Sequence, residues 1–327
     1  MICLGIESTA HTFGVSVVTD DKKVLSNERK LYTTEEGGMI PAKVADHHVN
    51  ICGDLIRKAM DKAKVKWKDI NLLAFSQSPG QGHTLRIGAF ITRYLSLKHN
   101  IPMVGVNHCI AHLEIGNMLT ESSDPVLLYV SGVNTQVIAY DAGKYRIFGE
   151  TLDIGVGNFL DSFARHIGLG FPGGPKVEKL ALKGKNLIEL PYNVKGMDFN
   201  LGGILTNLKQ KWNSGKYTKE DLCYSLQEYV FAMLMEISER ALAHCDKKEL
   251  LLGGGVACNK RLQKMAQIMC KERGAKCFVV PNEFNLDNAA MIAWTGIIMN
   301  KAGVVTKIKD SKVNPYERTD EVKVVWR

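Results

Sequence analysis

ICLGIESTAHTFGVSVVTDDKKVLSNER, residues 2–29, is the stretch that decides the fold. It holds three short segments with strand-like composition, at 2–7, 12–18 and 23–29, and each segment ends at a turn signal. This pattern predicts three successive β-strands. The elements predicted next are, in order, a helix (about 44–64), a strand (72–76), a helix (about 85–98), a strand (103–106) and a helix from His108.

The second half of the chain repeats this order. Three strands are predicted at 126–131, 135–141 and 145–151. After a helical insertion (about 157–215) come a helix (about 219–244), a strand (250–252), a helix from about 259, a strand (277–280) and a helix from about 287. Three strands followed by alternating helices and strands, twice over, predict a duplicated α/β fold with two domains and an interdomain cleft.

The domain boundary is predicted near Glu121–Asp124, where a polar turn with Pro125 breaks the pattern. We therefore expect a first domain at 1–123 and a second at 124–303 that includes the helical insertion. The polar tail at about 304–327 is expected to pack on the first domain.

Composition indicates a globular cytoplasmic protein and is compatible with a polyanionic partner. The 327 residues have no signal-peptide pattern, no apolar run of about 18 residues and no CxxC pair among eight cysteines, so we expect reduced thiols and no membrane association. The net charge is +8, and the cations cluster at 57–68 and 209–219. Such clusters can bind phosphates of a nucleic acid, but solvated helix faces and loops account for most clusters of this kind.

His108-Cys-Ile-Ala-His112 is the first candidate metal site. Histidines four residues apart share one face of a helix and can bind the same ion. A metalloprotease of the HExxH type needs a glutamate after the first histidine, and Cys109 stands there instead. The pattern therefore favours a metal site over a protease, and two unrelated surface histidines remain the alternative.

The repeat predicts a third metal ligand. Asp287 begins the helix that corresponds, in the second half, to the helix with the two histidines. Two neutral imidazoles and one carboxylate are a common ligand set for Zn²⁺ or Fe²⁺. The alternative is that Asp287 only caps its own helix.

Three polar or glycine-rich turns are candidates for phosphate binding. Glu7-Ser8-Thr9 and Ser131-Gly-Val-Asn-Thr135 follow the first strand of each half, and both offer amides and hydroxyls. The sequence LLLGGGVACNKR (250–261) leads from a buried strand through three glycines into a helix, which lets a ligand approach the backbone. It does not match GxGxxG, so a dinucleotide fold is disfavoured.

Taken together, these stretches resemble the tRNA threonylcarbamoyladenosine transferase family, the catalytic subunit of the archaeal and eukaryotic KEOPS complex, over nearly the whole chain. The resemblance implies the fold shared by actin, hexokinase and the heat-shock ATPases (the ASKHA fold). The motifs that carry it include GIESTAHT (5–12), FSQSPGQG (75–82), VGVNHCIAHLE (104–114), YVSGVNTQV (129–137), FGETLDIGVGN (148–158), GFPGGPKVEKLA (170–181), LGGGVACNKRL (252–262) and DNAAMIAW (287–294).

The resemblance implies transfer of L-threonylcarbamoyl from its adenylate to the adenosine that follows the anticodon, in tRNAs reading codons that begin with A. By motif, iron or zinc would be held by His108, His112, Asp287 and Tyr129. The donor adenylate, or ATP or ADP in its place, would be lined by Glu7, Ser8, Thr9, Tyr129, Val130, Ser131, Gly132, Val133, Asn134, Thr135, Asp161, Gly174, Glu178 and Asn259.

The resemblance also implies binding partners, and the departures of this chain from the family's motifs leave alternative functions open. The resemblance implies tRNA, an atypical small kinase, a small dimerising subunit and a regulatory subunit as partners. The chain departs from the family's usual SGGNT at Val133 and from its MDLSFSG loop at 197–203. The alternatives are an ASKHA-class ATPase or small-molecule kinase, and a catalytically weakened scaffold subunit of the same complex.

Overall fold

The computed structural model describes residues 1–34 and 40–327. Contacts divide the chain into two units, each with its own hydrophobic core. The first unit comprises Met1–Leu119, Gly143–Tyr145 and Pro281–Arg327, and the second comprises Thr120–Ala142 and Arg146–Val280. No helix among the described residues has the length and apolarity needed to cross a bilayer.

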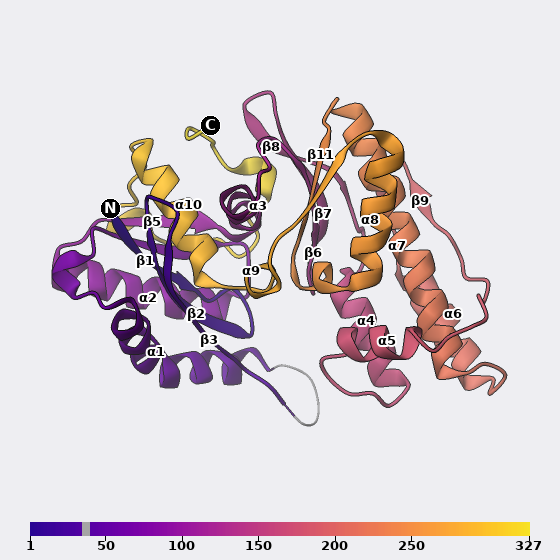
Figure 1. Ribbon diagram of the computed structural model, residues 1–327. Coiled ribbons are helices and arrows are strands. Elements are labelled where there is room, and N and C mark those ends of the chain that lie inside the picture. Colours follow the sequence, from indigo (N-terminus) through magenta and orange to yellow (C-terminus); the bar gives the residue numbers. More distant parts are fainter. Residues whose placement is uncertain (35–39) are drawn as a thin grey trace. The chain divides into compact units, whose positions relative to one another are not determined.

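A five-stranded sheet of order β3-β2-β1-β4-β5 forms the centre of the first unit (Figure 1). Its strands are β1 (Ile2–Glu7), β2 (Thr12–Thr19), β3 (Val24–Leu31), β4 (Leu72–Ser78) and β5 (Met103–Asn107). β1 pairs antiparallel with β2 and parallel with β4, and β4 pairs parallel with β5. The three strands predicted from residues 2–29 are therefore confirmed as an antiparallel meander on the edge of a parallel sheet.

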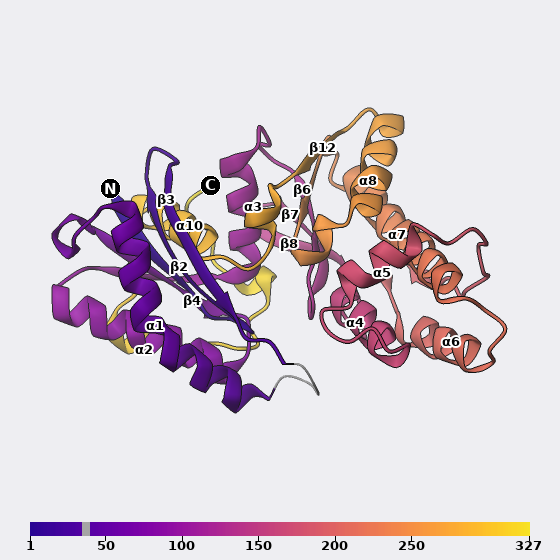
Figure 2. The same cartoon turned by 60° about the horizontal axis from the view of Figure 1, so that its bottom comes forward.

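Helices cover both faces of this sheet, because successive side chains of a strand point to opposite faces. α1 (Pro41–Ala63) and α2 (Gly82–His99) lie side by side against the face that carries Leu4 and Ile6 (Figures 1 and 2). α3 (His108–Leu119) and α10 (Ala289–Lys301) pack in the core that contains Cys3 of β1. The N-terminal strand is thus buried between helices from the beginning and the end of the chain.

α10 belongs to the first unit, whereas the sequence analysis placed residues up to 303 in the second domain. The short helix α9 (Asn282–Asn285) precedes it. A small residue at Gly5 of β1 explains the close packing, since a Cβ there would lie only 2.5 Å from the carbonyl oxygen of Ala289. The order of elements along the chain predicted that the second domain ends at residue 303. In the structure, the second unit ends at Val280 and the chain returns to the first unit at Pro281.

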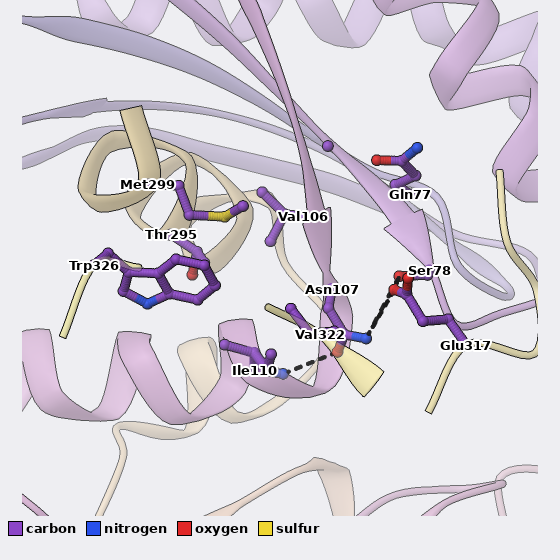
Figure 3. A pocket seen from close by; sticks show the side chains of 11 residues that line it. Gln77, Ser78, Val106, Asn107, Ile110, Thr295, Met299, Glu317, Val322 and Trp326 are labelled. Carbon is purple, nitrogen blue, oxygen red and sulfur yellow. Dashed lines mark hydrogen bonds between the residues drawn. The ribbon is translucent and has the colours of Figure 1, made fainter. Parts of the chain in front are cut away.

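The C-terminal tail runs past the ends of β4 and β5 in the same unit. The side-chain amide of Gln77 donates to the carbonyl oxygens of Asp310, at 3.0 Å, and Lys312, at 2.8 Å. Further along, the Glu317 carboxylate accepts hydrogen bonds from Ser78 and Asn107. These contacts close a cavity of about 110 Å³ beside the start of α3 (Figure 3). Two single-turn 3₁₀ helices, Ile308–Asp310 and Thr319–Glu321, lie within the tail.

The second unit has a sheet of the same plan, with strand order β12-β11-β6-β7-β8. The strands of this sheet are β6 (Val126–Val130), β7 (Thr135–Asp141), β8 (Lys144–Glu150), β11 (Glu249–Gly253) and β12 (Lys276–Val279). The first two residues of β8 are counted with the first unit. β6 pairs antiparallel with β7 and parallel with β11, as β1 does with β2 and β4. The predicted duplication is confirmed.

The helices of the second unit pack around one continuous core. They are α4 (Val156–His166), α5 (Gly174–Ala181), α6 (Gly202–Asn213), α7 (Lys219–His244) and α8 (Lys260–Arg273), with a 3₁₀ turn at Gly255–Cys258 and a two-stranded ribbon of β9 (Val194–Lys195) and β10 (Asp198–Phe199). α7 has the bounds predicted from the sequence. It begins at Thr218, whose hydroxyl accepts a hydrogen bond from the amide of Asp221.

Candidate metal centre and substrate loops

α3 carries the two histidines directly after a buried strand. The side-chain oxygen of Asn107, the last residue of β5, accepts hydrogen bonds from the amides of Cys109, at 3.1 Å, and Ile110, at 3.2 Å. The helix therefore begins at His108, and His112 follows one turn later. Their ring centroids lie 4.8 Å apart, and both side chains are buried.

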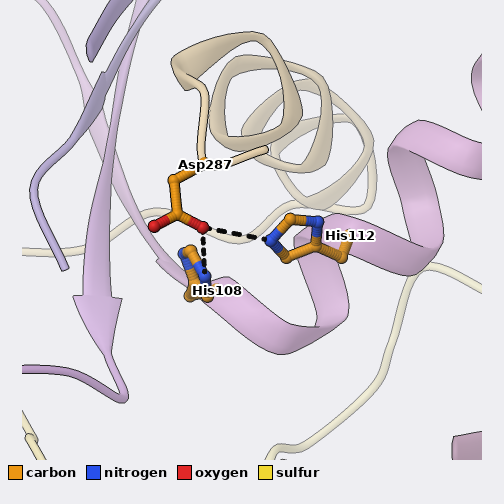
Figure 4. Close-up of side chains that lie close together, drawn as sticks. All are labelled: His108, His112 and Asp287. Atoms are coloured by element: carbon orange, nitrogen blue, oxygen red, sulfur yellow. Dashed lines mark ion pairs between the residues drawn. The ribbon is translucent and has the colours of Figure 1, made fainter. Parts of the chain in front are cut away.

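Asp287 completes a group of three metal-ligating side chains (Figure 4). One of its carboxylate oxygens lies 3.4 Å from Nε2 of His108 and 3.6 Å from Nε2 of His112. The three ligand atoms all lie within 4.8 Å of one another, which suits one divalent cation. The sequence therefore identified all three members of this group.

Asp287 does not cap its helix, so the alternative given for it in the sequence analysis is wrong. The cap of α10 is Asn288, whose side-chain oxygen accepts a hydrogen bond from the amide of Met291 at 3.2 Å. Its side-chain nitrogen also donates to the carbonyl oxygens of Phe284 and Leu286. Because the neighbouring amide side chain satisfies the helix start, the Asp287 carboxylate is directed at the two imidazoles.

Glu7 and Thr9 hold the other nitrogen of His108. One Glu7 carboxylate oxygen lies 3.1 Å from Nδ1 of His108, and the other accepts hydrogen bonds from the amide and the hydroxyl of Thr9. The Thr9 hydroxyl lies 3.3 Å from the same Nδ1. A carboxylate on one ring nitrogen fixes the tautomer and points the other nitrogen at a metal. The donor set therefore fits a metal ion.

The electrostatics of the group also suit a cation. Burial lowers the pKa of His112, so its imidazole is neutral near pH 7. Burial on its own would raise the pKa of Asp287, but hydrogen bonds from His108 and His112 outweigh it and hold the pKa well below its usual range. A neutral imidazole and an ionised carboxylate are the forms that bind metal.

In the second unit, the turn between β6 and β7 is fixed by its own hydrogen bonds. The Ser131 hydroxyl donates to the carbonyl oxygen of Asn134 and accepts from the amide of the same residue. Thr135 accepts from the amide of Val156 at the start of α4. Val133 has ordinary negative backbone φ, and its side chain is 67% exposed, so the valine does not strain this turn.

Three other predicted substrate residues organise the starts of helices. Asp161 accepts a hydrogen bond from the amide of Gly173, just before α5. Glu178 accepts from the amide of Lys260, and Asn259 caps α8 through the amides of its first turn. Gly174 is the first residue of α5. These side chains thus connect α4, α5 and α8 within one unit.

Tyr129 is buried near the end of β6, beside the glycine-rich end of β11. Gly254 has φ of +92°, and a Cβ on it would lie 2.4 Å from the carbonyl oxygen of Val130. Only glycine fits both conditions. The three glycines therefore have a structural role in this unit, because they let the backbone after β11 approach the backbone at the end of β6.

Sequence reasoning missed the residues that support the metal ligands. Asn107 caps α3, Asn288 caps α10, and a carboxylate oxygen of Glu7 lies 3.1 Å from Nδ1 of His108. The side chain of Arg29 also donates to the carbonyl oxygen of Glu283, four residues before Asp287. An asparagine immediately before each helix was the available signal for the two caps.

Two sheets of one plan and a His–His–Asp group define an ASKHA-type protein with a candidate metal centre. The crystal structure of Thermococcus kodakarensis HypF matches 90% of this chain and 47% of that chain, with a TM-score of 0.65 and 14% identity. Component A of Acidaminococcus fermentans (R)-2-hydroxyglutaryl-CoA dehydratase matches 93% of this chain and 100% of that chain, with a TM-score of 0.58 and 15% identity. These likenesses confirm the predicted fold.

The chain belongs to the TsaD family, tRNA N6-adenosine threonylcarbamoyltransferase, whose model matches residues 23–294. The tRNA N6-adenosine threonylcarbamoyltransferase of Thermococcus kodakarensis is 56% identical over 326 residues, covering 100% of both chains. A probable bifunctional tRNA threonylcarbamoyladenosine biosynthesis protein of Methanocaldococcus jannaschii is 52% identical, over 100% of this chain and 60% of that protein. The predicted family and its tRNA-modifying transferase activity are confirmed.

Proposed function

We propose that the chain uses threonylcarbamoyl-adenylate as the donor and the adenosine following the anticodon as the acceptor, in tRNAs reading codons that begin with A. The adenosine N6 forms a bond to the carbamoyl carbon. The bond from that carbon to the phosphate oxygen breaks, AMP leaves, and N6 loses a proton. The observation that carries this proposal is the convergence of His108, His112 and Asp287 in a member of this transferase family.

We assign Fe²⁺ or Zn²⁺ to these three side chains, with the Tyr129 phenolic oxygen as a further ligand. Two imidazoles and one carboxylate leave positions open on either ion. A bound ion would supply Lewis-acid polarisation of the donor's carbonyl or stabilise the departing phosphate. The 3.1 Å contact of Glu7 with His108 supports a positioning role for this carboxylate.

The donor's adenylate, or ATP or ADP in its place, is assigned to the loops of the second unit. Backbone amides and hydroxyls of the Ser131–Thr135 turn suit the phosphate, and the helix starts tied by Asp161, Glu178 and Asn259 suit the nucleoside. The remaining members of this set are Val130, Gly132, Val133, Asn134 and Gly174 from the second unit, and Ser8 and Thr9 from the first. Both Ser8 and Thr9 are buried.

The proposed setting is the cytoplasm, in a KEOPS-type assembly. The resemblance implies an atypical small kinase, a small dimerising subunit and a regulatory subunit beside the tRNA. These partners would share the positioning of the tRNA, and the donor would come from a separate enzyme that activates threonine as a carbamoyl-adenylate.

Nucleoside mass spectrometry on unmodified tRNA of the matching anticodon class tests the reaction. The tRNA is incubated with the chain, the expected partners and threonylcarbamoyl-adenylate. His108→Ala is expected to lose both bound metal and product. His99→Ala is the matched control, because this histidine stacks on Trp67 away from the metal group. Wild type that binds donor and tRNA yet makes no threonylcarbamoyladenosine would overturn the proposal in favour of a scaffold subunit.

A further inference from the structure

Positive charge is concentrated in one segment of the second unit. Residues 156–219 contain ten lysines and arginines against four aspartates and glutamates, a net charge of +6 out of +8 for the whole chain. Residues 199–219 contain four lysines and no acidic residue. This stretch forms α6, the following turn and the first residue of α7. The metal centre and the substrate loops do not account for these lysines.

Aromatic rings hold two of the four lysines in place. Nζ of Lys211 lies 5.2 Å from the ring centroid of Tyr217, and Nζ of Lys219 lies 5.3 Å from that of Trp212. His166, at the end of α4, hydrogen-bonds Asn213 at the end of α6 at 3.0 Å, so the basic end of α4 lies beside them. A cation–π contact orients an ammonium group without neutralising its charge.

The basic cluster of the first unit, at 57–68, is different because carboxylates pair with three of its six cations. Lys58 and Lys62 both pair with Glu28, at 2.7 and 2.8 Å, and Arg57 pairs with Asp54 at 3.3 Å. In the part of the chain that the structure describes, no carboxylate lies within 4.0 Å of the ammonium groups of Lys209, Lys211, Lys216 and Lys219. The charge of the second cluster is therefore available to an anionic partner.

We propose that Lys209, Lys211, Lys216 and Lys219, hereafter the lysine surface, bind the phosphate backbone of the substrate tRNA. The inference rests on the proposed function and names the surface that holds its substrate. Uncompensated lysines gain affinity by releasing counterions from a polyanion. The partly buried rings of Trp212 and Tyr217 serve as supports beneath the lysines, and contacts to phosphates give affinity without reading sequence.

The test compares two variants with the same change in charge. The first is Lys209→Gln, Lys211→Gln, Lys216→Gln, and the control is Lys64→Gln, Lys66→Gln, Lys68→Gln in the first unit, where all three lysines are exposed. Filter binding of unmodified tRNA transcript is measured over a series of salt concentrations, with the chain in its complex. A fourth protein, Lys211→Arg with Lys216→Arg, keeps the charge.

We expect the first variant to bind tRNA about tenfold or more weakly near 0.15 M salt, with a salt slope that falls by about one for each phosphate no longer neutralised. The control and the arginine variant should bind like wild type. Equal binding by all proteins, or an equal decrease in the control, would overturn the lysine surface. So would an unchanged tRNA affinity with loss of a partner subunit, which would assign the lysines to a protein.

Product formation separates this proposal from the proposed function. If wild type makes threonylcarbamoyladenosine and the first variant binds tRNA normally, the lysine surface is wrong and the function stands. If wild type makes no product although the first variant loses tRNA binding, the surface stands and the function is wrong. Circular dichroism of each variant shows that the loss of binding does not come from unfolding.

Discussion

Two side chains of the His–His–Asp group depend on neighbours outside that group. Glu7 engages His108 through one oxygen and Thr9 through the other, while Asn288 leaves Asp287 free of capping. Two of the three candidate metal ligands are therefore oriented by residues that hold the backbone and the tautomer. Such supporting interactions change metal affinity by about 10- to 100-fold when they are removed.

Glu7→Gln is predicted to weaken metal binding by about 10- to 100-fold with little change in folding. The amide keeps an acceptor for the Thr9 amide but loses the negative charge beside Nδ1 of His108. Competition with a metal-binding dye measures the affinity. Glu317→Gln, in the C-terminal tail, is a control for loss of a partly buried carboxylate elsewhere in the unit. Unchanged metal affinity in Glu7→Gln would contradict the positioning of His108 by Glu7 and would favour direct contact of Glu7 with the donor.

At the scale of the element, the start of α10 sets the place of the third ligand. Asn288→Ala removes the cap and is predicted to cost about 1 kcal/mol of the free energy of unfolding. It should also weaken metal binding, because the Asp287 backbone is no longer held. Thr218→Ala removes the cap of α7 in the second unit at a similar cost. Equal metal affinity in the two variants would contradict the role of Asn288.

α1 gives the first unit a predicted response to acid. His48 is fully buried, its Nε2 lies 3.0 Å from the carbonyl oxygen of Ala10, and its Nδ1 has no partner among the described residues. Burial lowers the pKa of His48 to about 4. The unfolded chain, with a pKa near 6.5, therefore binds the proton first as pH falls.

Stability from His48 is therefore complete above about pH 6.5 and is lost progressively down to about pH 4, by a total on the order of 3 kcal/mol. Urea unfolding at several pH values measures this slope. His48→Gln keeps a donor for Ala10 but cannot titrate, so its unfolding free energy should change less over the same range. Parallel slopes for the two proteins would show that His48 does not carry the effect.

Helices and strands could be predicted from the sequence where part of the element stays exposed, because polar and apolar residues then alternate with a recognisable period. The strands of residues 2–29 and the long helix Lys219–His244 were found because turn signals and a helix cap mark their ends. α3 has no amphipathic stripe, since ten of its twelve residues are buried, and only its histidine spacing identified it. The caps at Asn107 and Asn288 were missed because a side chain's partner depends on the three-dimensional arrangement of neighbouring segments.

At the scale of the whole molecule, the chain ends in the unit where it begins. The sequence predicted the duplicated fold but divided it along the chain, so residues 281–303 fell in the wrong half. Asp287 reaches the histidines because α10 packs on β1 within one unit, and not through the correspondence of two domains that suggested it. A repeat pattern gives the order of elements, and only packing gives their assignment to a core.

Gly5→Ala is predicted to destabilise the first unit by about 2–3 kcal/mol, because overpacking at a tight helix–sheet contact forces the helix outward. The added Cβ would lie 2.5 Å from the carbonyl oxygen of Ala289 and 2.8 Å from Cβ of Ala293. Since Asp287 directly precedes α10, metal affinity should fall as well.

Gly53→Ala is the matched control for Gly5→Ala, which changes the contact between β1 and α10. Gly53 lies on the exposed face of α1, and a Cβ on it meets nothing within 4 Å. The change should therefore stabilise by up to about 1 kcal/mol and leave metal affinity unchanged. Thermal unfolding and metal titration of both variants give the comparison. If Gly5→Ala matched wild type in both measurements, α10 would not lie against β1. The packing of α10 would then not explain why Asp287 lies near the two histidines.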